Sequence, residues 1–182
     1  MTYNPKYLTK NSIPNSVTHL TINNKIKGSI DRCIPNSVVY LNFNGTYDNI
    51  IYKGDIPDNV RCLIFGNNFD QYIEEGAIPN SVVCLNFGKL YNKPVNNVIP
   101  NNVKNLTFGY EFNKPIENAI PNNTNHIEFG YMFNQSLKNS IPDSVTRLVF
   151  NYGLKSIYKI NKKFMNNIAK HTQPVSYTHL RA

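Results

Sequence analysis

The fold is decided by the stretch Ile99-Pro-Asn-Asn-Val-Lys-Asn-Leu-Thr-Phe-Gly-Tyr-Glu-Phe-Asn-Lys-Pro-Ile116, which is followed after three residues by a near copy running from Ile120 to Leu137. The Ile-Pro pair that opens it recurs seven times in the 182-residue chain. The seven prolines are Pro14, Pro35, Pro57, Pro79, Pro100, Pro121 and Pro142, and successive ones are 21 or 22 residues apart. Self-similarity at a fixed period in this range indicates a solenoid of stacked repeats.

Each repeat carries a short apolar run with the period of a β-strand. In Val82-Val-Cys-Leu-Asn-Phe87 and Val103-Lys-Asn-Leu-Thr-Phe108, Leu and Phe face one side and the residues between them face the other. A second apolar column follows four residues after each run, and a third follows eight residues after the first six runs. One coil cannot bury these side chains alone, but coils stacked at a strand spacing of about 4.8 Å can. We therefore predict a mainly β solenoid with irregular coils and a short, parallel, in-register sheet.

The prolines fit the corner before each strand. Proline presets the φ angle for a turn and lacks the N–H donor that an interior strand requires. A continuous helical fold is excluded, because no repeat sustains a 3.6-residue period between its prolines.

The columns together read Ile-Pro-x-Ser-Val-x-x-Leu-x-Phe-Gly-x-x-Phe-Asn, which closely resembles the FNIP repeat, a relative of leucine-rich repeats. Phe112-Asn113, Phe133-Asn134, the variants Tyr91-Asn92 and Phe69-Asp70, and every Ile-Pro pair carry the resemblance, which covers about Ile13 to Leu154. It implies a leucine-rich-repeat-like fold and a role in protein interaction. Some members of this family carry an F-box that couples them to ubiquitin ligases. About twelve residues precede the first Ile-Pro pair, too few for an F-box, so an adaptor role would make this chain a fragment of a substrate adaptor.

We divide the chain into four segments. Residues 1–12 are an N-terminal cap segment, and residues 13–154 hold seven FNIP-like repeats. Residues 155–173 are expected to form a basic amphipathic capping helix, because its apolar residues repeat with helical spacing. Residues 174–182 are interpreted as a non-native tail, because this stretch resembles a translated sequencing-library adapter.

The net charge of +8 is unevenly distributed. Up to Phe150 there are 13 Lys and Arg against 11 Asp and Glu, whereas the remainder holds six basic residues and no acidic one. A basic helix there could bind nucleic acid or another anionic polymer, which is our alternative function. We favour a capping helix with a solvated lysine face, since that is the usual role of a charge run.

The sequence also predicts the cellular compartment of the protein. The sequence has no apolar stretch of membrane-spanning length and no secretory signal, so we expect an intracellular, cytoplasmic protein with no membrane partner. Its three cysteines do not make a disulfide framework, and reduced thiols fit best.

No constellation of residues predicts an enzyme. His19 and His126 share a column but lie five repeats apart, about 24 Å at the strand spacing. Cys62 and Cys84 should lie side by side on adjacent strands, yet without further ligands we interpret them as free thiols. We interpret the Asp and Asn that follow the aromatic column as a ladder that satisfies backbone groups, and the regular glycines as backbone geometry. We expect no metal, no cofactor and no small-molecule substrate.

The outward strand positions are the surface most suited to binding. One row reads His19, Tyr40, Cys62, Cys84, Asn105, His126, Arg147, and its neighbour reads Thr21, Asn42, Ile64, Asn86, Thr107, Glu128, Val149. These positions vary while the inward columns do not, and their mixture of side chains suits protein contact. Our candidate partner-binding residues are His19, Tyr40, Asn42, Ile64, Asn105, His126, Glu128 and Arg147. We predict a non-enzymatic protein–protein interaction module; a purely structural repeat protein would show the same variability and stays an alternative.

Overall fold

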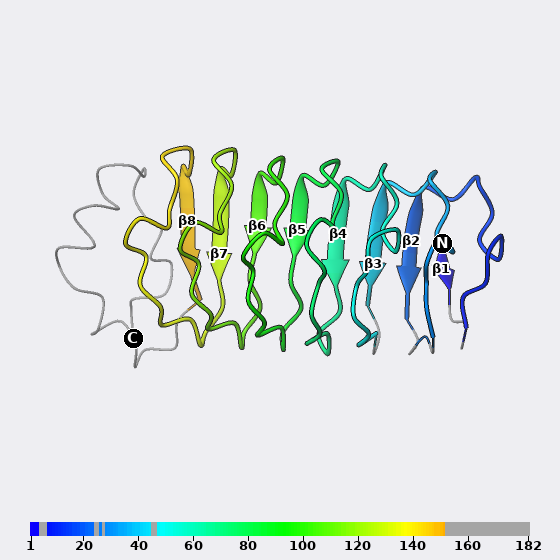
Figure 1. The fold of residues 1–182 in the computed structure, drawn as a ribbon, viewed down its shortest axis with the longest axis horizontal. Helices are drawn as coiled ribbons and strands as arrows, with labels where there is room; N and C mark the ends of the chain where they lie inside the picture. The colour runs from blue at the N-terminus through cyan, green and yellow to red at the C-terminus, as the bar shows by residue number, and fades with distance from the viewer. Residues whose placement is uncertain (4–6, 24–25, 27, 45–46, 152–182) are drawn as a thin grey trace, which may run out of the picture.

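The computed structural model of the chain describes residues 1–3, 7–23, 26, 28–44 and 47–151. Eight strands form one parallel sheet in which the order in space follows the order in sequence. The strands are β1 (Thr2–Tyr3), β2 (His19–Ile22), β3 (Tyr40–Phe43), β4 (Cys62–Phe65), β5 (Cys84–Asn86), β6 (Asn105–Thr107), β7 (His126–Phe129) and β8 (Arg147–Phe150). Figure 1 shows them side by side along the long axis, each joined to the next by a returning loop. The architecture is the predicted parallel solenoid, with about six turns.

The register is continuous across the sheet. Leu41 pairs with Leu63 and Phe43 with Phe65, and from β2 to β8 each strand repeats this alignment with the next. In β3 and β4 the second and fourth residues are buried and the first and third are half-buried. This alternation confirms the inward columns that the Leu-x-Phe pattern predicts, because successive side chains of a strand point to opposite faces.

Two stacks of aromatic rings run through the core. The strand phenylalanines from Phe43 to Phe150 stack with ring centroids 5.2–6.0 Å apart. The second column, from Tyr47 to Phe133, stacks at 5.7–6.5 Å. Within one coil the two stacks also touch, as at Phe65 and Phe69, whose centroids are 4.4 Å apart. Stacked pairs contribute about 0.5–1.5 kcal/mol beyond the area they bury, so the stacks hold the coils in register.

Each Ile-Pro corner is closed by the same backbone hydrogen bond. The N–H three residues after the proline donates to the proline carbonyl, as from Val60 to Pro57 at 3.1 Å and from Val103 to Pro100 at 3.2 Å. All seven corners have this bond. The prolines therefore sit in tight turns before the strands, as the sequence predicts.

A further column is defined by backbone conformation and not by residue type. The residue two positions before each Ile-Pro pair has a positive φ in all seven repeats. These residues are Asn11, Arg32, Gly54, Gly76, Asn97, Asn118 and Asn139, with φ between 51° and 96°. Glycine and asparagine adopt this conformation most readily, which explains six of the seven.

The N-terminal segment adds a strand that the repeat pattern does not predict. β1 pairs with β2, and the amide of Thr21 donates to the carbonyl of Met1 at 2.9 Å. The amino group of Met1 donates to the carbonyl of His19 at 2.7 Å, and Leu8 is buried against the first coil. These contacts continue the sheet beyond the first Ile-Pro repeat.

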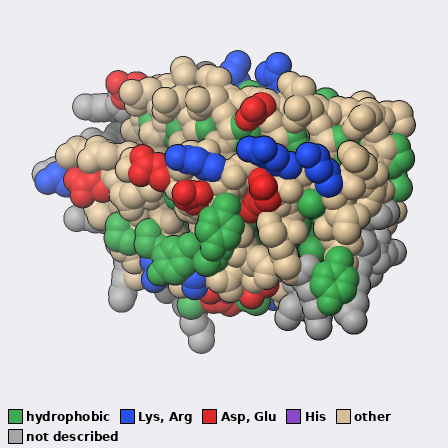
Figure 2. Space-filling view, turned by 45° about the vertical axis from the view of Figure 1, so that its right-hand side comes forward, with side chains coloured by type: hydrophobic (Ala, Val, Ile, Leu, Met, Phe, Trp, Pro, Cys, Tyr) green, Lys and Arg blue, Asp and Glu red, His purple; other side chains and the backbone are tan. Residues whose placement is uncertain are grey.

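Two predicted segments lie outside the described residues, namely the capping helix 155–173 and the tail 174–182. None of the described segments forms a helix long and apolar enough to cross a membrane. On the face shown in Figure 2, basic and acidic side chains lie close to one another beside a group of hydrophobic ones.

Candidate functional site

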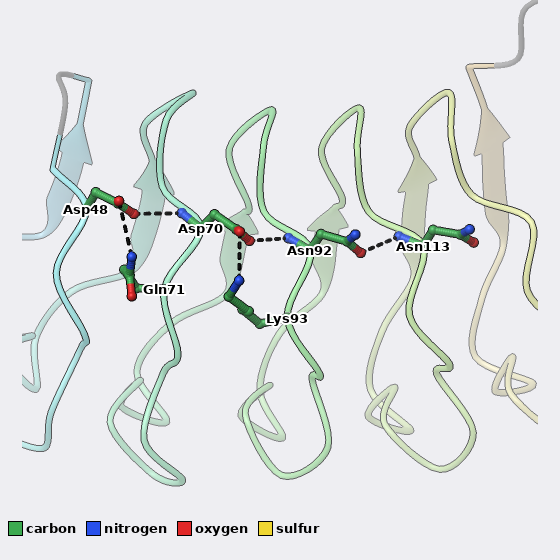
Figure 3. Close-up of polar contacts among 6 residues, drawn as sticks. All are labelled: Asp48, Asp70, Gln71, Asn92, Lys93 and Asn113. Carbon is green, nitrogen blue, oxygen red and sulfur yellow. Dashed lines mark hydrogen bonds and ion pairs between the residues drawn. The ribbon is translucent and has the colours of Figure 1, made fainter.

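The polar column beside the second aromatic stack forms a continuous hydrogen-bond ladder (Figure 3). A side-chain oxygen of Asp48 accepts from the backbone N–H of Asp70 at 3.0 Å, and Asp70 accepts in the same way from Asn92 at 2.8 Å. Asn92 then accepts from Asn113 at 3.0 Å, and Asn113 from Asn134 at 2.9 Å. This confirms the interpretation of the column as a structural ladder.

The second oxygen of each carboxylate in the ladder is also paired. Gln71 donates to Asp48 at 3.1 Å, and Lys93 forms an ion pair with Asp70 at 2.7 Å. Their polar groups are thus used within the coil stack. The column therefore has a structural role. Polar side chains also lie on the outward side of the sheet.

Strand pairing places the two outward rows as the sequence predicts. His19, Tyr40, Cys62, Cys84, Asn105, His126 and Arg147 are consecutive partners in one row, and Thr21, Asn42, Ile64, Asn86, Thr107, Glu128 and Val149 in the other. His19, Asn105 and Arg147 are exposed, and the remaining members are half-buried. We call these fourteen positions the outward face.

At one end of the outward face, His19, Tyr40 and Asn42 lie together. The rings of His19 and Tyr40 stack with centroids 5.6 Å apart and planes 20° from parallel. The amide nitrogen of Asn42 lies 3.5 Å from the Tyr40 hydroxyl, and the Nδ1 of His19 pairs with the Thr18 hydroxyl at 3.0 Å. These contacts present two rings to solvent in a fixed orientation.

At the other end, His126 pairs with Arg147 on β8, and Glu128 lies two residues further along its own strand. Burial lowers the pKa of His126, the charge of Arg147 lowers it further, and Glu128 opposes both. The imidazole is therefore neutral at neutral pH, and its buried Nε2 has no hydrogen-bond partner among the described residues. Glu128 accepts from the side-chain amide of Asn151 at 2.5 Å.

The eight candidate residues do not meet in one compact site. Ile64 is the third of the seven residues in its row, and Asn105 separates Cys84 from His126. The candidates form two end clusters with Ile64 between them, so they are spread along the sheet. No group of three or more His, Cys, Asp and Glu that could hold a metal occurs in the part of the chain that the structure describes.

A recess of about 270 Å³ opens beside the second outward row. Its lining includes Asn42, Ile64, Asn86 and Thr107 from that row, and Lys89 and Tyr110 from the turns that follow the strands. The Tyr110 ring stacks on Tyr131 with centroids 5.0 Å apart, and the Lys89 ammonium lies 5.5 Å from its centroid. Sequence reasoning missed Lys89, Tyr110 and Tyr131. The variable column two residues after each strand phenylalanine was the signal that could have found them.

Close packing of backbones at the glycine column shapes this recess. A Cβ on Gly88 would lie only 1.8 Å from the carbonyl oxygen of Gly66, and one on Gly109 only 1.9 Å from that of Gly88. Glycine is therefore required at positions 88, 109 and 130, where one glycine turn stacks on another, which supports its interpretation as backbone geometry. The next side chain along, such as Lys89 or Tyr110, borders the recess.

A larger hollow of about 970 Å³ follows the Ile-Pro corners of the later coils. Asn, Ile and Pro dominate its lining, and several of its polar groups are engaged between coils. Asn102 donates to the carbonyl of Asn80 at 2.8 Å, and Asn123 donates to that of Asn101 at 3.1 Å. Because the same residue types return in every coil, we assign this hollow to the architecture and keep the outward face as the candidate site.

Three consecutive segments, residues 3–46, 47–90 and 91–132, match the family model of the FNIP repeat. Each match spans two coils, and together they cover more than half of the chain. The chain belongs to the FNIP repeat family. In the phenylalanine-asparagine pair of the FNIP pattern, the phenylalanine belongs to the second aromatic stack and the asparagine belongs to the hydrogen-bond ladder.

Two further similarities place this FNIP protein among known ones. Over 147 residues it is 99% identical to a putative F-box and FNIP repeat-containing protein of Acanthamoeba polyphaga mimivirus, and the match covers 81% of the chain. The chain spans about 28% of the length of that curated relative. The crystal structure of CroV588, a novel circular LRR protein, superposes with a TM-score of 0.75 at 36% identity, over 84% of this chain and 24% of that one. The leucine-rich-repeat-like solenoid is thereby confirmed.

Proposed function

We propose that this FNIP repeat chain is a non-enzymatic protein-interaction module that binds its partner through the outward face. The supporting observation is that two in-register rows of varied side chains lie on a rigid sheet, with a recess beside them. The residues beneath the face repeat from coil to coil, whereas those on it do not. A solenoid of this kind offers an extended surface whose chemistry can change without disturbing the stack.

The chemistry of the face suits a protein partner. Tyrosine and arginine are enriched among the residues that dominate protein interfaces, and the face carries Tyr40 and Arg147, with Tyr110 at the recess. The stacking of Tyr40 on His19 and of Tyr110 on Tyr131 orients these rings before binding. Preorganised side chains lose less conformational entropy on association, which favours affinity.

We further propose that the chain supplies the target-binding part of a ubiquitin-ligase substrate adaptor in the cytoplasm. The mimiviral relative is named for an F-box as well as for FNIP repeats, and the chain matches only part of its length. In such a protein the F-box would connect to the ligase and the repeats would hold the target.

The test is capture of proteins from an Acanthamoeba polyphaga lysate on the immobilised full chain. The face variant combines Tyr40→Ala, His126→Ala and Arg147→Ala. The matched control combines Tyr52→Ala, Tyr72→Ala and Lys138→Ala, three exposed positions away from the outward face. We expect a protein that binds the native chain and the control, and whose binding falls at least tenfold with the face variant, since truncating one anchor costs over about 1.4 kcal/mol.

Equal capture by all three baits would contradict the proposal that the outward face binds. Recovery of nucleic acid alone, released by modest salt, would favour the alternative in which the basic segment 155–170 binds an anionic polymer. Binding driven by phosphate contacts weakens steeply with salt, whereas an aromatic-anchored protein contact does not.

A further inference from the structure

Cys62 and Cys84 are paired residues on adjacent strands of the outward face. They begin β4 and β5, they are direct partners in the parallel register, and both side chains are half-buried. Both are free thiols, and the Cys62 thiol donates a hydrogen bond to the sulfur of Cys84. These two half-buried thiols lie side by side on the outward face and are not among the eight candidate binding residues.

The spacing of the two residues permits a disulfide bond. Strand neighbours lie about 4.8 Å apart, within the Cα separation of roughly 4.4–6.8 Å that disulfides accept. Their Cβ atoms, at about the same spacing, exceed the preferred range of roughly 3.5–4.5 Å by a few tenths of an ångström. A bond formed here would carry some strain, and strained exposed disulfides are the readily reduced ones.

The two cysteines also differ in the way that disulfide formation needs, since one must act as the nucleophile and the other must remain a thiol until the second step. The hydrogen bond from Cys62 lowers the pKa of Cys84 to about 7, although burial opposes the shift. The same hydrogen bond, with burial, raises the pKa of Cys62. Cys84 therefore loses its proton more readily than Cys62, and the thiolate is the nucleophilic form.

We propose that Cys62 and Cys84 form a dithiol site that a peroxide oxidises to a reversible disulfide within the folded chain. The Cys84 thiolate attacks one oxygen of hydrogen peroxide, which yields the sulfenic acid of Cys84 and hydroxide. The Cys62 sulfur, as it loses its proton, then attacks the sulfenic sulfur and displaces a second hydroxide. The hydroxides take up two protons to give two waters, so two thiols lose two electrons and one peroxide gains them. A dithiol reductant reverses the step by exchange.

Cys33 provides an internal comparison. Its thiol lies 3.4 Å from the carbonyl of Asp31 and 3.6 Å from that of Leu8. Burial and the nearby Asp31 and Asp55 raise the pKa of Cys33, so it stays protonated and unreactive at neutral pH. Oxidation of Cys62 and Cys84 within one chain requires no protein partner.

The experiment treats the full chain with hydrogen peroxide at neutral pH, denatures it, and alkylates the remaining thiols before mass spectrometry. We expect three alkylated cysteines before oxidation and one after, with a peptide cross-link that joins Cys62 to Cys84 and disappears on reduction with dithiothreitol. Cys33→Ser should leave the cross-link intact. Three alkylated cysteines after treatment, or a cross-link between two chains, would overturn the proposal.

Two variants at Cys62 test the division of roles without relying on the bond. Cys62→Ser keeps a hydroxyl donor, and Cys62→Ala removes it; circular dichroism checks that both fold. In both, dimedone should trap the sulfenic acid of Cys84 after peroxide treatment, because no resolving thiol remains. Iodoacetamide should react with Cys84 about fivefold more slowly at pH 7 in Cys62→Ala than in Cys62→Ser, since the gain in nucleophilicity only partly offsets the lost thiolate. Equal rates, or dimedone on Cys33 instead, would contradict the assignment.

Discussion

Arg32 occupies a backbone position that six other repeats fill with asparagine or glycine. Its φ is 51°, in the left-handed region that costs most side chains about 1–2 kcal/mol. Its contact with Asp31 does not offset this cost, because the atoms are 3.9 Å apart and both side chains are largely exposed. The side chain at this position is therefore a local source of strain in an otherwise regular column.

We expect Arg32→Asn to stabilise the protein by about 1 kcal/mol, because asparagine adopts the left-handed conformation readily. Chemical denaturation would measure the free energy of unfolding. Arg32→Lys, which keeps the charge and the Cβ, should leave stability unchanged. An equal gain in the free energy of unfolding from both variants would mean that the φ angle of residue 32 is not the cause.

Tyr91 places a hydroxyl in the aromatic core. The oxygen is buried without a hydrogen-bond partner among the described residues, and burial raises the pKa of the phenol. Its neighbours in the stack, Phe69 and Phe112, lack the hydroxyl. We expect Tyr91→Phe to raise the free energy of unfolding by about 1 kcal/mol, because an unpaired buried polar group costs about 1–3 kcal/mol. Phe69→Tyr is the reciprocal control and should destabilise; a loss of stability in Tyr91→Phe would show that the hydroxyl has a partner.

His126 gives the outward face a pH dependence. Because folding lowers its pKa below the unfolded value, the folded state favours the neutral imidazole. Its contribution to stability is present above the unfolded pKa and is lost as the pH falls through the folded one. An NMR titration of His126 should give a pKa below about 6.5. Arg147→Gln should raise that pKa and Glu128→Gln should lower it further, while Lys138→Gln should leave it unchanged; no response to Arg147→Gln would contradict this electrostatic account.

At the scale of the element, each coil is held to the next by three kinds of contact: strand pairing, ring stacking and the Asp/Asn ladder. The turns that leave the strands add a steric condition, because the backbones of consecutive glycines touch there. The ladder tolerates either Asp or Asn, since both supply an acceptor oxygen. The glycine column tolerates no side chain where glycine stacks on glycine.

We expect Gly109→Ala to destabilise the protein by about 3 kcal/mol or more, since the added methyl would overlap the backbone of the preceding coil. Gly28→Ala is the control. No atom lies within 4 Å of its Cβ position, so only its positive φ of 87° opposes alanine, at a cost of about 1–2 kcal/mol. Thermal and urea unfolding would compare the two; similar losses would mean that the glycine turns can move apart.

At the scale of the whole molecule, the contacts form a one-dimensional chain, because each strand pairs only with its neighbours in sequence. Stability is then a sum over coils and the interfaces between them, and an end coil has one interface fewer. The first strand, Thr2–Tyr3, is also the shortest.

We therefore expect hydrogen exchange to be slowest in β4–β6 and progressively faster towards β1, as local opening begins at the N-terminal end. Exchange measured by mass spectrometry would map this gradient. Leu85→Ala, at a fully buried central position, should cost about 2–5 kcal/mol and accelerate exchange in its own and adjacent coils first. Uniform protection from β1 to β6 would indicate a single cooperative unit instead.

The amino-acid sequence alone is enough to predict the stacked coils, their parallel register and the inward columns. A side chain such as Leu63 or Phe65 recurs at a fixed spacing, and only in-register stacking buries every copy. It also determined which residues point outward, because alternation along a strand follows from local geometry alone. The pairing of Cys62 with Cys84 is a consequence of the same periodicity.

The features that depend on how closely the coils approach one another could be found only in the three-dimensional structure. The left-handed column was hidden because Asn11, Arg32 and Gly54 share a conformation and not a chemistry. The recess beside Tyr110 is lined by stacked glycine turns whose backbones touch, and a single repeat does not reveal that distance. Likewise, the shift in the pKa of Cys84 arises from a contact between coils. The repeat period determines which residues become neighbours. The distances between their atoms determine the hydrogen bonds, steric contacts and pKa shifts that result.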